Sequence, residues 1–195
     1  MSYALPLQLN MDQLTFTPTP LAGAIVVQPR IFHDARGYFY ESYQAKAYQA
    51  NGIDATFVQD NQAYSTKGAL RGLHYQVSPH AQAKLVRVTH GRVLDVIVDI
   101  RPGSPTYGQW YSVELSADNH RQLYVPHGMA HGYQVLSDTA IFNYKCDSYY
   151  HRDSEGGVRF DDPRLNITWQ GDPTDFIVSE KDLAQPLFGQ HRPYE

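Results

Sequence analysis

The chain has 195 residues, a formal net charge of -4 and a single cysteine, Cys146. This length is typical of one domain, while the acidic balance excludes general nucleic-acid binding as the main activity and the lone cysteine excludes an intramolecular disulfide. We expect no secretory signal and no membrane span, and therefore a soluble cytoplasmic protein with residues 1–195 in one domain and 1–12 as a loosely ordered leader.

The first part of the chain predicts few regular elements. Two short strands are expected at 14–17 and 24–28, followed by a turn at 33–37 and a strand over Tyr38–Tyr43. Residues 44–51 are the best helix candidate, and Gly52 is expected to end that helix.

From residue 84 onward the hydrophobic pattern has a period of two. Residues 84–89 and 93–100 flank the turn His90-Gly91 and predict a hairpin. In its second strand the even positions are apolar while Asp95 and Asp99 occupy odd positions, which predicts an apolar inward face and a partly charged outward face. Further strands are expected at 110–115, 122–125, 132–135 and 140–146. Many short strands predict an all-β sandwich or jelly-roll barrel with a few short helices, and the stretch after Asp161 should pack over it as irregular structure.

The stretch from Gly68 to Gln76 contains a cation, a histidine, an aromatic ring and an amide. On an extended backbone Gly72, His74 and Gln76 share one face. A histidine on an inward face, beside a glycine that lets other groups approach closely, is well placed for proton transfer. Taken alone the stretch leaves open a purely structural, hydrogen-bonded histidine.

A second motif, Pro126–Gly132 (PHGMAHG), joins two expected strands and resembles the second motif of the cupin superfamily of small β-barrels. The place of the first cupin motif is taken by His74-Tyr75-Gln76, with Lys84 downstream. Metal-binding cupins have two histidines and a glutamate there, whereas a lysine would repel a divalent ion. His127 and His131 are four residues apart, but proline and glycine argue against a helix that would pair them on a metal. We therefore expect a cupin-type jelly-roll β-barrel without metal.

Within the cupins the chain resembles the dTDP-4-dehydrorhamnose 3,5-epimerases, which invert two carbons of a nucleotide-linked 4-keto-6-deoxy sugar. The resemblance extends from Phe16 to about Leu187 and rests on separate motifs in matching order. They are Phe32–Glu41, Phe57–Asn61, Leu70–Gln76, Gln82–Val86, Asp95–Arg101, Ser104–Thr106, Pro126–Gly132, Asn143–Lys145, Tyr149–Tyr150 and Ser179–Asp182. One such motif is weak evidence, whereas the ordered series is specific.

Epimerisation beside a ketone passes through an enolate, so it needs a base on one face of the sugar, an acid on the other and positive charge near the carbonyl oxygen. The resemblance implies that His74 is the base, and that Asp182 holds its tautomer and stabilises its charged form. It also implies that Lys84 faces the enolate and that Tyr144 is the acid.

The resemblance further implies a dTDP-sugar as the substrate. Arg71, Arg36 and Lys181 match the diphosphate and its surroundings, and Tyr150 matches the ring that stacks on thymine. Other ligand contacts are matched by Glu41, Gln59, Asn61, His131 and Glu155. The family pattern implies no cofactor, no nucleic-acid or membrane partner, and a homodimer whose exchanged strand carries Arg36 and Glu41 into the neighbouring site.

Three other functions remain open at this point. A single-carbon epimerase, acting at C3 or C5 of a related dTDP-4-keto-6-deoxy sugar, would use the same base and acid. A non-catalytic sugar-nucleotide-binding cupin would keep the cations and the stacking ring, but would have no reason to keep the base, lysine and acid together. A metal-dependent cupin oxygenase or isomerase would contain stoichiometric metal.

Overall fold

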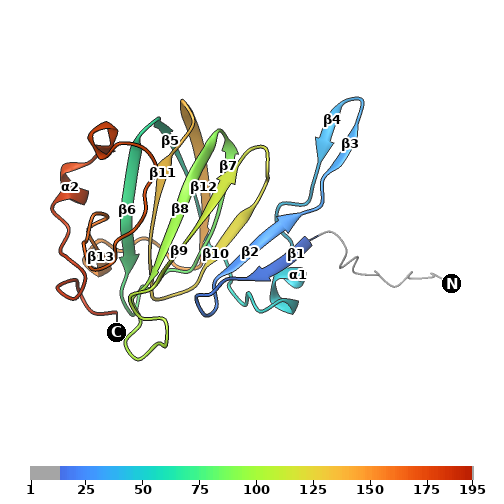
Figure 1. Ribbon diagram of the computed structural model, residues 1–195. Coiled ribbons are helices and arrows are strands. Elements are labelled where there is room, and N and C mark those ends of the chain that lie inside the picture. Colours follow the sequence, from blue (N-terminus) through green and yellow to red (C-terminus); the bar gives the residue numbers. More distant parts are fainter. Residues whose placement is uncertain (1–13, 195) are drawn as a thin grey trace.

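Two antiparallel sheets make up most of the computed structural model, which describes residues 14–194 (Figure 1). The first sheet has the order β1 (Leu14–Pro18), β2 (Ile25–Pro29), β10 (Gln122–Val125), β7 (Lys84–His90), β12 (Thr139–Cys146) and β5 (Gln59–Thr66). The second has the order β13 (Glu155–Gly157), β6 (Ala69–Gln76), β11 (Met129–Val135), β8 (Arg92–Asp99) and β9 (Trp110–Ser116), and β14 (Ile177–Val178) adds to β6 in parallel. The expected leader lies outside the described residues.

The remaining elements are short. A hairpin is formed by β3 (Phe32–Asp34) and β4 (Gly37–Phe39), and the α-helices are α1 (Ala45–Ala50) and α2 (Glu180–Leu183). Single 3₁₀ turns lie at Arg152–Ser154 and Pro173–Asp175. Among residues 14–194, no helix is long and apolar enough to cross a membrane.

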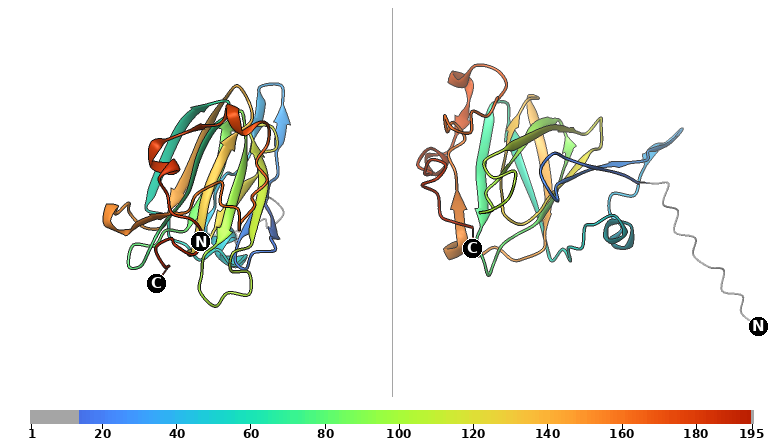
Figure 2. Two further views of the ribbon diagram at one scale, coloured as in Figure 1. Left: turned by 60° about the vertical axis from the view of Figure 1, so that its left-hand side comes forward. Right: turned by 60° about the horizontal axis from the view of Figure 1, so that its bottom comes forward.

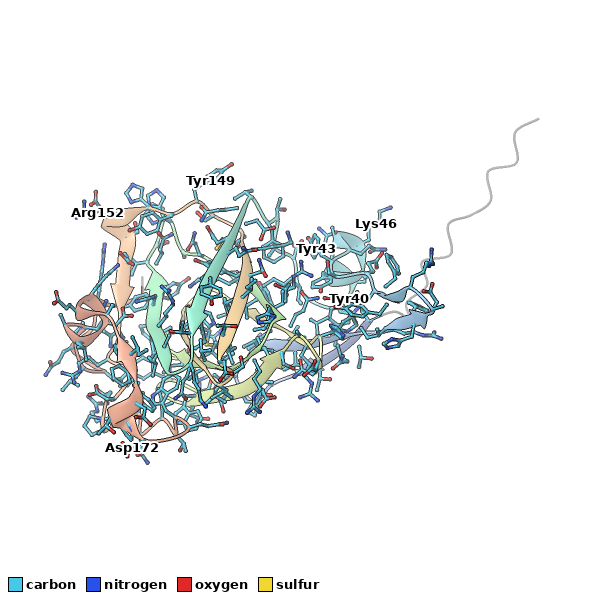
Figure 3. The ribbon with its side chains drawn as sticks, turned by 90° about the horizontal axis from the view of Figure 1, so that it is seen from above. Tyr40, Tyr43, Lys46, Tyr149, Arg152 and Asp172 are labelled. Atoms are coloured by element: carbon cyan, nitrogen blue, oxygen red, sulfur yellow. The ribbon has the colours of Figure 1, made fainter. Side chains whose placement is uncertain are left out.

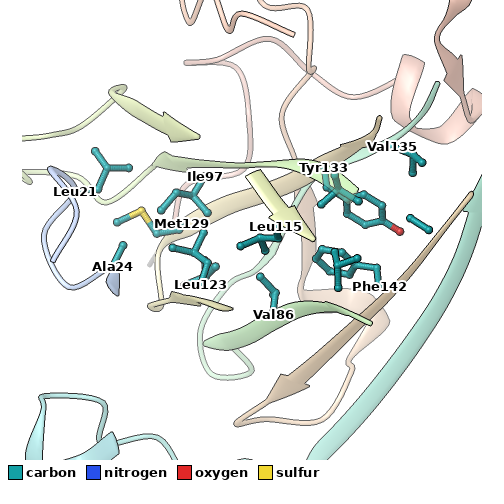
Figure 4. Close-up of a cluster of buried hydrophobic side chains, with 14 residues drawn as sticks. Leu21, Ala24, Val86, Ile97, Leu115, Leu123, Met129, Tyr133, Val135 and Phe142 are labelled. Atoms are coloured by element: carbon teal, nitrogen blue, oxygen red, sulfur yellow. The ribbon is translucent and has the colours of Figure 1, made fainter. Parts of the chain in front are cut away.

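Apolar side chains from both sheets meet in one interior cluster, shown in Figure 4. Val86 and Phe142 come from the first sheet, while Ile97, Leu115 and Tyr133 come from the second. Burying the facing surfaces of two sheets against each other is what closes a β-sandwich. The all-β, cupin-type jelly-roll predicted from the sequence is confirmed.

Strand β8 is buried on both faces, so the predicted charged outward face is wrong. Val93 and Ile97 lie in the interior cluster between the sheets. Asp95 is on the same face of β8 as these two residues, so it points toward the interior. The even-numbered residues face the other way and are covered by residues such as Leu165 and Phe188 from the C-terminal stretch. Both aspartates are fully buried. The C-terminal stretch is mostly irregular and packs over this sheet, as predicted (Figure 2).

Asp99 is stabilised by the loop that follows its strand. Its carboxylate accepts hydrogen bonds from the Arg101 side chain at 2.9 and 2.7 Å and from the hydroxyls of Ser104 and Thr106 at 2.6 Å each. Burial alone would raise the pKa of Asp99, but these hydrogen bonds lower it to about 2. The Ser104–Thr106 motif thus holds a buried charge in place.

The helix predicted over 44–51 is confirmed as α1. The Gln44 side chain caps its start by accepting from the Ala47 backbone N–H at 2.7 Å. Tyr48 is fully buried against Leu14 and Val27, and this contact attaches the helix to the first sheet.

The strand predicted over Tyr38–Tyr43 is wrong in its extent. Only Gly37–Phe39 is extended in a ladder, as β4, and its partner is the neighbouring β3. The hairpin projects beyond the sandwich on the side away from α2 (Figure 1), and Tyr40 and Tyr43 lie near α1 (Figure 3). Residues 40–44 have no pairing strand among the described residues, so they do not form part of a sheet.

Candidate active site

A pocket of about 440 Å³ opens between the two sheets at one end of the sandwich. It is lined by Gln59, Asn61, His74, Tyr75, Gln76, Gln82, Lys84, Tyr144, Tyr150 and Glu155. Most of the site residues predicted from the sequence are therefore brought together, although they come from five different strands and a loop.

A second hollow, of about 480 Å³, is lined by charged residues such as Lys67, Arg92 and Asp172. Neither a histidine nor a tyrosine lines it. None of the site residues predicted from the sequence lines it either, so the smaller pocket is the candidate active site.

His74 and Asp182 form a short pair at the wall of this pocket. The His74 Nε2 lies 2.6 Å from Asp182 Oδ1, with the imidazole 31% exposed and the carboxylate 5% exposed. Asp182 is held at the start of α2, where its backbone N–H donates to the Ser179 hydroxyl at 3.1 Å. With Nε2 bonded to the carboxylate, Nδ1 is the ring nitrogen left for a ligand.

The charge of Asp182 is maintained by its partners. Burial alone would raise the pKa of this carboxyl, but the hydrogen bond and charge of His74, with further hydrogen bonds from Gly72 and Ser179, lower it below its usual value. A carboxylate that stays ionised can stabilise a protonated imidazole beside it.

Two glycines set the position of His74. Its Cα lies opposite that of His131 on β11, close to a shift in the register between β6 and β11. A Cβ on Gly72 would lie 2.6 Å from the Gly132 Cα, and a Cβ on Gly132 would lie 2.6 Å from the Arg71 carbonyl oxygen. Only residues without side chains allow these two backbones to approach so closely.

Lys84 and Tyr144 face the pocket from the opposite sheet to His74. The Lys84 Nζ lies 5.9 Å from the centroid of the Tyr144 ring. Desolvation lowers the pKa of Lys84, although Cys146, Asp95 and Glu155 act in the other direction. Desolvation also raises the pKa of Tyr144, so its phenol is protonated at neutral pH and can donate a proton. A base on one sheet and a proton donor on the other suit a reaction on two faces of a ligand.

The pairing of His131 with Asp95 was not predicted from the sequence. His131 Nε2 lies 3.1 and 3.0 Å from the two carboxylate oxygens of Asp95, and both side chains are buried. Burial raises the pKa of Asp95, opposed by His131 and by the charge of Lys84. The signal that could have found this pair was the presence of acidic residues in a mostly apolar strand, because a charge is buried only with a partner.

The side of the pocket that contains Glu155, Gln59 and Asn61 is an ionic and amide network. Glu155 accepts from Lys181 at 2.6 Å and from the Tyr150 hydroxyl at 3.2 Å. Burial alone would raise the pKa of Glu155, but the hydrogen bond from Lys181 helps to lower it below its usual value. Gln59 and Asn61 are hydrogen-bonded to each other at 3.2 Å. Arg71 is more exposed and donates to Ser65 at 3.1 Å.

Of the predicted site residues that do not line the pocket, Asp182 and Lys181 bond to the lining residues His74 and Glu155, and Arg71 and His131 lie on the neighbouring strands β6 and β11. Arg36 and Glu41 come from the segment before α1. Neither lines the pocket of its own chain. Arg36 lies on the projecting hairpin, where its 91% exposed side chain pairs with Asp34 at 2.6 Å.

Potential metal ligands are dispersed. Among residues 14–194, no group of three or more histidine, cysteine, aspartate or glutamate side chains is placed to bind a metal ion. His127 pairs with Asp147 at 2.8 Å, away from the His131–Asp95 pair.

Comparison with known proteins gives one consistent result. The family model described as dTDP-4-dehydrorhamnose 3,5-epimerase matches residues 18–190. A curated protein of that name from Methanothermobacter thermautotrophicus is 46% identical over 173 residues, which cover 88% of this chain and 93% of the relative. Another of the same name from Escherichia coli is 48% identical over 165 residues, covering 84% and 89%.

Solved structures agree with the sequence relatives. The chain is similar to dTDP-6-deoxy-D-glucose-3,5-epimerase from Legionella pneumophila in complex with dTDP-4-keto-L-rhamnose, with 49% identity, a TM-score of 0.86 and coverage of 90% and 93%. It is also similar to a 3'-monoepimerase from Streptomyces bikiniensis in complex with dTDP-quinovose, with 36% identity, a TM-score of 0.84 and coverage of 89% and 87%.

Proposed function

The chain belongs to the dTDP-4-dehydrorhamnose 3,5-epimerase family, and we propose that His74 and Tyr144 are the base and the acid of its reaction. The protein is an isomerase that epimerises C3 and C5 of dTDP-4-dehydro-6-deoxy-D-glucose to dTDP-4-dehydro-L-rhamnose, in dTDP-L-rhamnose biosynthesis. The observation that supports this assignment of roles is that His74, paired with Asp182, and the Tyr144 phenol lie on opposite sheets at one pocket.

His74 removes the proton from the sugar. The Nδ1 lone pair accepts the proton from the carbon beside the C4 ketone. The C–H electron pair becomes a carbon–carbon double bond, and the ketone oxygen takes the negative charge of the enolate. Asp182 then faces a protonated imidazole across 2.6 Å and stabilises its charge. The same contact fixes the tautomer before reaction.

The enolate is stabilised by Lys84. Its ammonium group lies in a desolvated position, where a charge interaction with an enolate oxygen is stronger than it would be in water. Tyr144 then gives its phenolic proton to the carbon from the other face, which inverts the centre. The imidazolium and the phenolate return to their starting forms by exchange with solvent, and the sequence is repeated at the second carbon.

The remaining predicted residues bind the nucleotide in this proposal. Tyr150 stacks on thymine, Arg71 and Lys181 neutralise the diphosphate, and Glu155 positions Lys181. Gln59 and Asn61, which line the pocket, supply further contacts to the ligand. The ligand contact predicted for His131 is left out of this proposal, because its ring is buried and does not line the pocket. We also propose that the chain works as a single domain in the cytoplasm, without metal or cofactor, and metal analysis of the active protein tests the last point.

We propose that Arg36 and Glu41 reach the pocket of a second copy in a homodimer. The hairpin exposes Tyr38 and Phe39, the latter by 69%, which is an unusual amount of aromatic surface for a segment that serves only its own chain. Mixing His74→Ala subunits with Arg36→Ala subunits should then restore activity, because one site of each mixed dimer is intact. A monomeric mass, or no recovery after proven subunit exchange, would contradict this arrangement.

The reaction itself is tested by incubating the protein with dTDP-4-keto-6-deoxyglucose and an NADPH-dependent 4-reductase. NADPH oxidation that depends on this protein is the expected result. NMR of the product distinguishes inversion at both carbons from inversion at one, and absence of any converted sugar would contradict the assignment.

A further inference from the structure

The segment from Asp147 to Ser154 carries Tyr150 but has little regular structure of its own. It joins β12 to β13 and contains a single 3₁₀ turn. Tyr149 and Tyr150 are 68% and 55% exposed, and Figure 3 shows Tyr149 at the outer edge of the molecule. An exposed connection of this kind has no intrinsic reason to hold one conformation.

Three glutamine side chains bind the backbone of this segment at successive residues. Gln82 Nε2 donates to the Ser148 carbonyl at 2.7 Å, and the Tyr150 backbone N–H donates to Gln59 Oε1 at 3.0 Å. Gln76 makes the other contacts, and these three glutamines are here named the glutamine clamp. Each of them also lines the pocket.

Gln76 is the central member of the clamp. It is 5% exposed on β6, two residues after His74. Its Nε2 donates to the carbonyls of His80 at 2.6 Å and Tyr149 at 3.3 Å, and its Oε1 accepts from the His151 N–H at 2.6 Å. Every polar atom of this amide is used, so the backbone on both sides of Tyr150 is tied to the strand that carries the base.

We propose that Gln76 is a positioning residue, which preorganises Tyr150 for the thymine ring and so determines much of the affinity for the nucleotide. The proposal rests on the role of Tyr150 given above. A ring that is already held in its binding orientation loses less conformational entropy when the base stacks on it. The clamp is made of neutral amides, so it supports the aromatic ring without adding charge beside the diphosphate.

The role predicts a specific pattern in Gln76→Leu. Calorimetric titration with dTDP should give a Kd about tenfold higher than that of the wild type. Turnover at saturating substrate should stay within about threefold, because His74, Lys84 and Tyr144 are not touched. In a Tyr150→Ala background the same substitution should change the Kd by less than about twofold, since the ring through which it acts is gone.

Gln134→Leu is the matched control. Gln134 is a buried glutamine that also ties a loop backbone, donating to the Gln170 carbonyl at 2.7 Å and accepting from its N–H at 2.9 Å, but it lines the other hollow. This variant should lose thermal stability as Gln76→Leu does while leaving the dTDP affinity unchanged. Stability and affinity are thereby separated.

The outcomes that overturn the proposal are distinct from failure of the proposed function. Wild-type protein that does not bind dTDP would contradict the function and the clamp together. If the wild type binds dTDP but folded Gln76→Leu has the same Kd, the clamp alone is overturned. The same holds if Gln76→Leu raises the Kd as much in the Tyr150→Ala background as in the wild type. If Gln76→Leu does not fold, Gln82→Leu decides, because a Kd raised about threefold supports the clamp and an unchanged Kd overturns it.

Discussion

Two histidines on neighbouring strands are each paired with an aspartate, yet only one of these pairs faces the pocket. His74 and His131 are opposite each other on β6 and β11, and each is bonded to a carboxylate. The His74 ring is 31% exposed and makes a single short contact with Asp182 at 2.6 Å. The His131 ring is 7% exposed and is held at 3.1 and 3.0 Å by both oxygens of a fully buried Asp95.

The difference shows that a pairing of residue types does not by itself make a catalytic base. An imidazole must combine a partner on one nitrogen with access to substrate on the other. Asp182 comes from α2 and binds His74 from outside the sheet, which leaves the pocket side of the ring open. Asp95 lies in the interior on β8, so its pair is expected to contribute to stability more than to proton transfer.

The largest expected effect separates the two pairs by activity. His74→Ala should lower the rate of epimerisation by about 10³-fold or more, because the base itself is removed. The dTDP affinity should stay close to that of the wild type, since His74 acts on the sugar. The reductase-coupled assay and calorimetry measure the two quantities, and substantial residual turnover would move the base elsewhere.

The converse effect should appear in stability. Asp95→Asn leaves His131 with a neutral partner in a buried position, and the free energy of unfolding should fall by about 3 kcal/mol. Chemical denaturation measures this loss. A variant as stable as the wild type would show that the inner pair is not structural.

Tyr144→Phe tests the face opposite His74. Removal of the hydroxyl should lower formation of inverted product by about 10²-fold while the ring and its packing are kept. Solvent deuterium should still enter the substrate, because His74 can return a deuteron to the face from which it took the proton. Inversion at the normal rate would assign the acid to another group.

Asp182→Asn should have a smaller effect on activity than removal of the base. The amide still holds the ring but no longer stabilises its charge, so a loss of about 30-fold is expected. The unfolding free energy should change by less than that of Asp95→Asn, because the His74 ring that Asp182 faces is partly exposed to water, whereas the His131 ring is buried. Comparable losses of stability in these two variants would contradict the assignment of a structural role to the His131–Asp95 pair alone.

A third carboxylate, Asp99, predicts the acid dependence of stability. Its folded pKa of about 2 lies below the ordinary 3.8, so its stabilisation is fully present above the ordinary value and is lost as the pH falls from about 4 to about 2. The stability difference between the wild type and Asp99→Asn should shrink by about 2 kcal/mol over this interval. Denaturation at several pH values measures it, and a constant difference would contradict the lowered pKa.

Local pattern predicted much of the fold. Alternation located β7, β8, β9, β10 and β12, and the helix candidate ended by Gly52 located α1. It failed where burial depends on distant segments. Asp95 looked like an outward charge because the sequence does not show that the C-terminal stretch covers the opposite face of β8.

The site was predictable in its parts and less so in its geometry. Motif order placed His74 and Asp182 in one reaction, although 108 residues separate them, but did not reveal that a short helix presents the carboxylate. The strand β5 was not foreseen because its pocket-facing residues, among them Gln59 and Asn61, are polar. The clamp role of Gln76 depends on loop backbone groups far along the chain, which no local pattern specifies.

We propose above all that the His74–Asp182 pair, with Tyr144 across the pocket, inverts both carbons beside the ketone. Product formed from dTDP-4-keto-6-deoxyglucose in deuterated water, analysed by NMR, tests it most directly. The account predicts deuterium at C3 and C5, with inversion at both, from wild-type protein, and no deuterium from His74→Ala that still binds dTDP. Deuterium at a single carbon, or exchange that persists in His74→Ala, would contradict it.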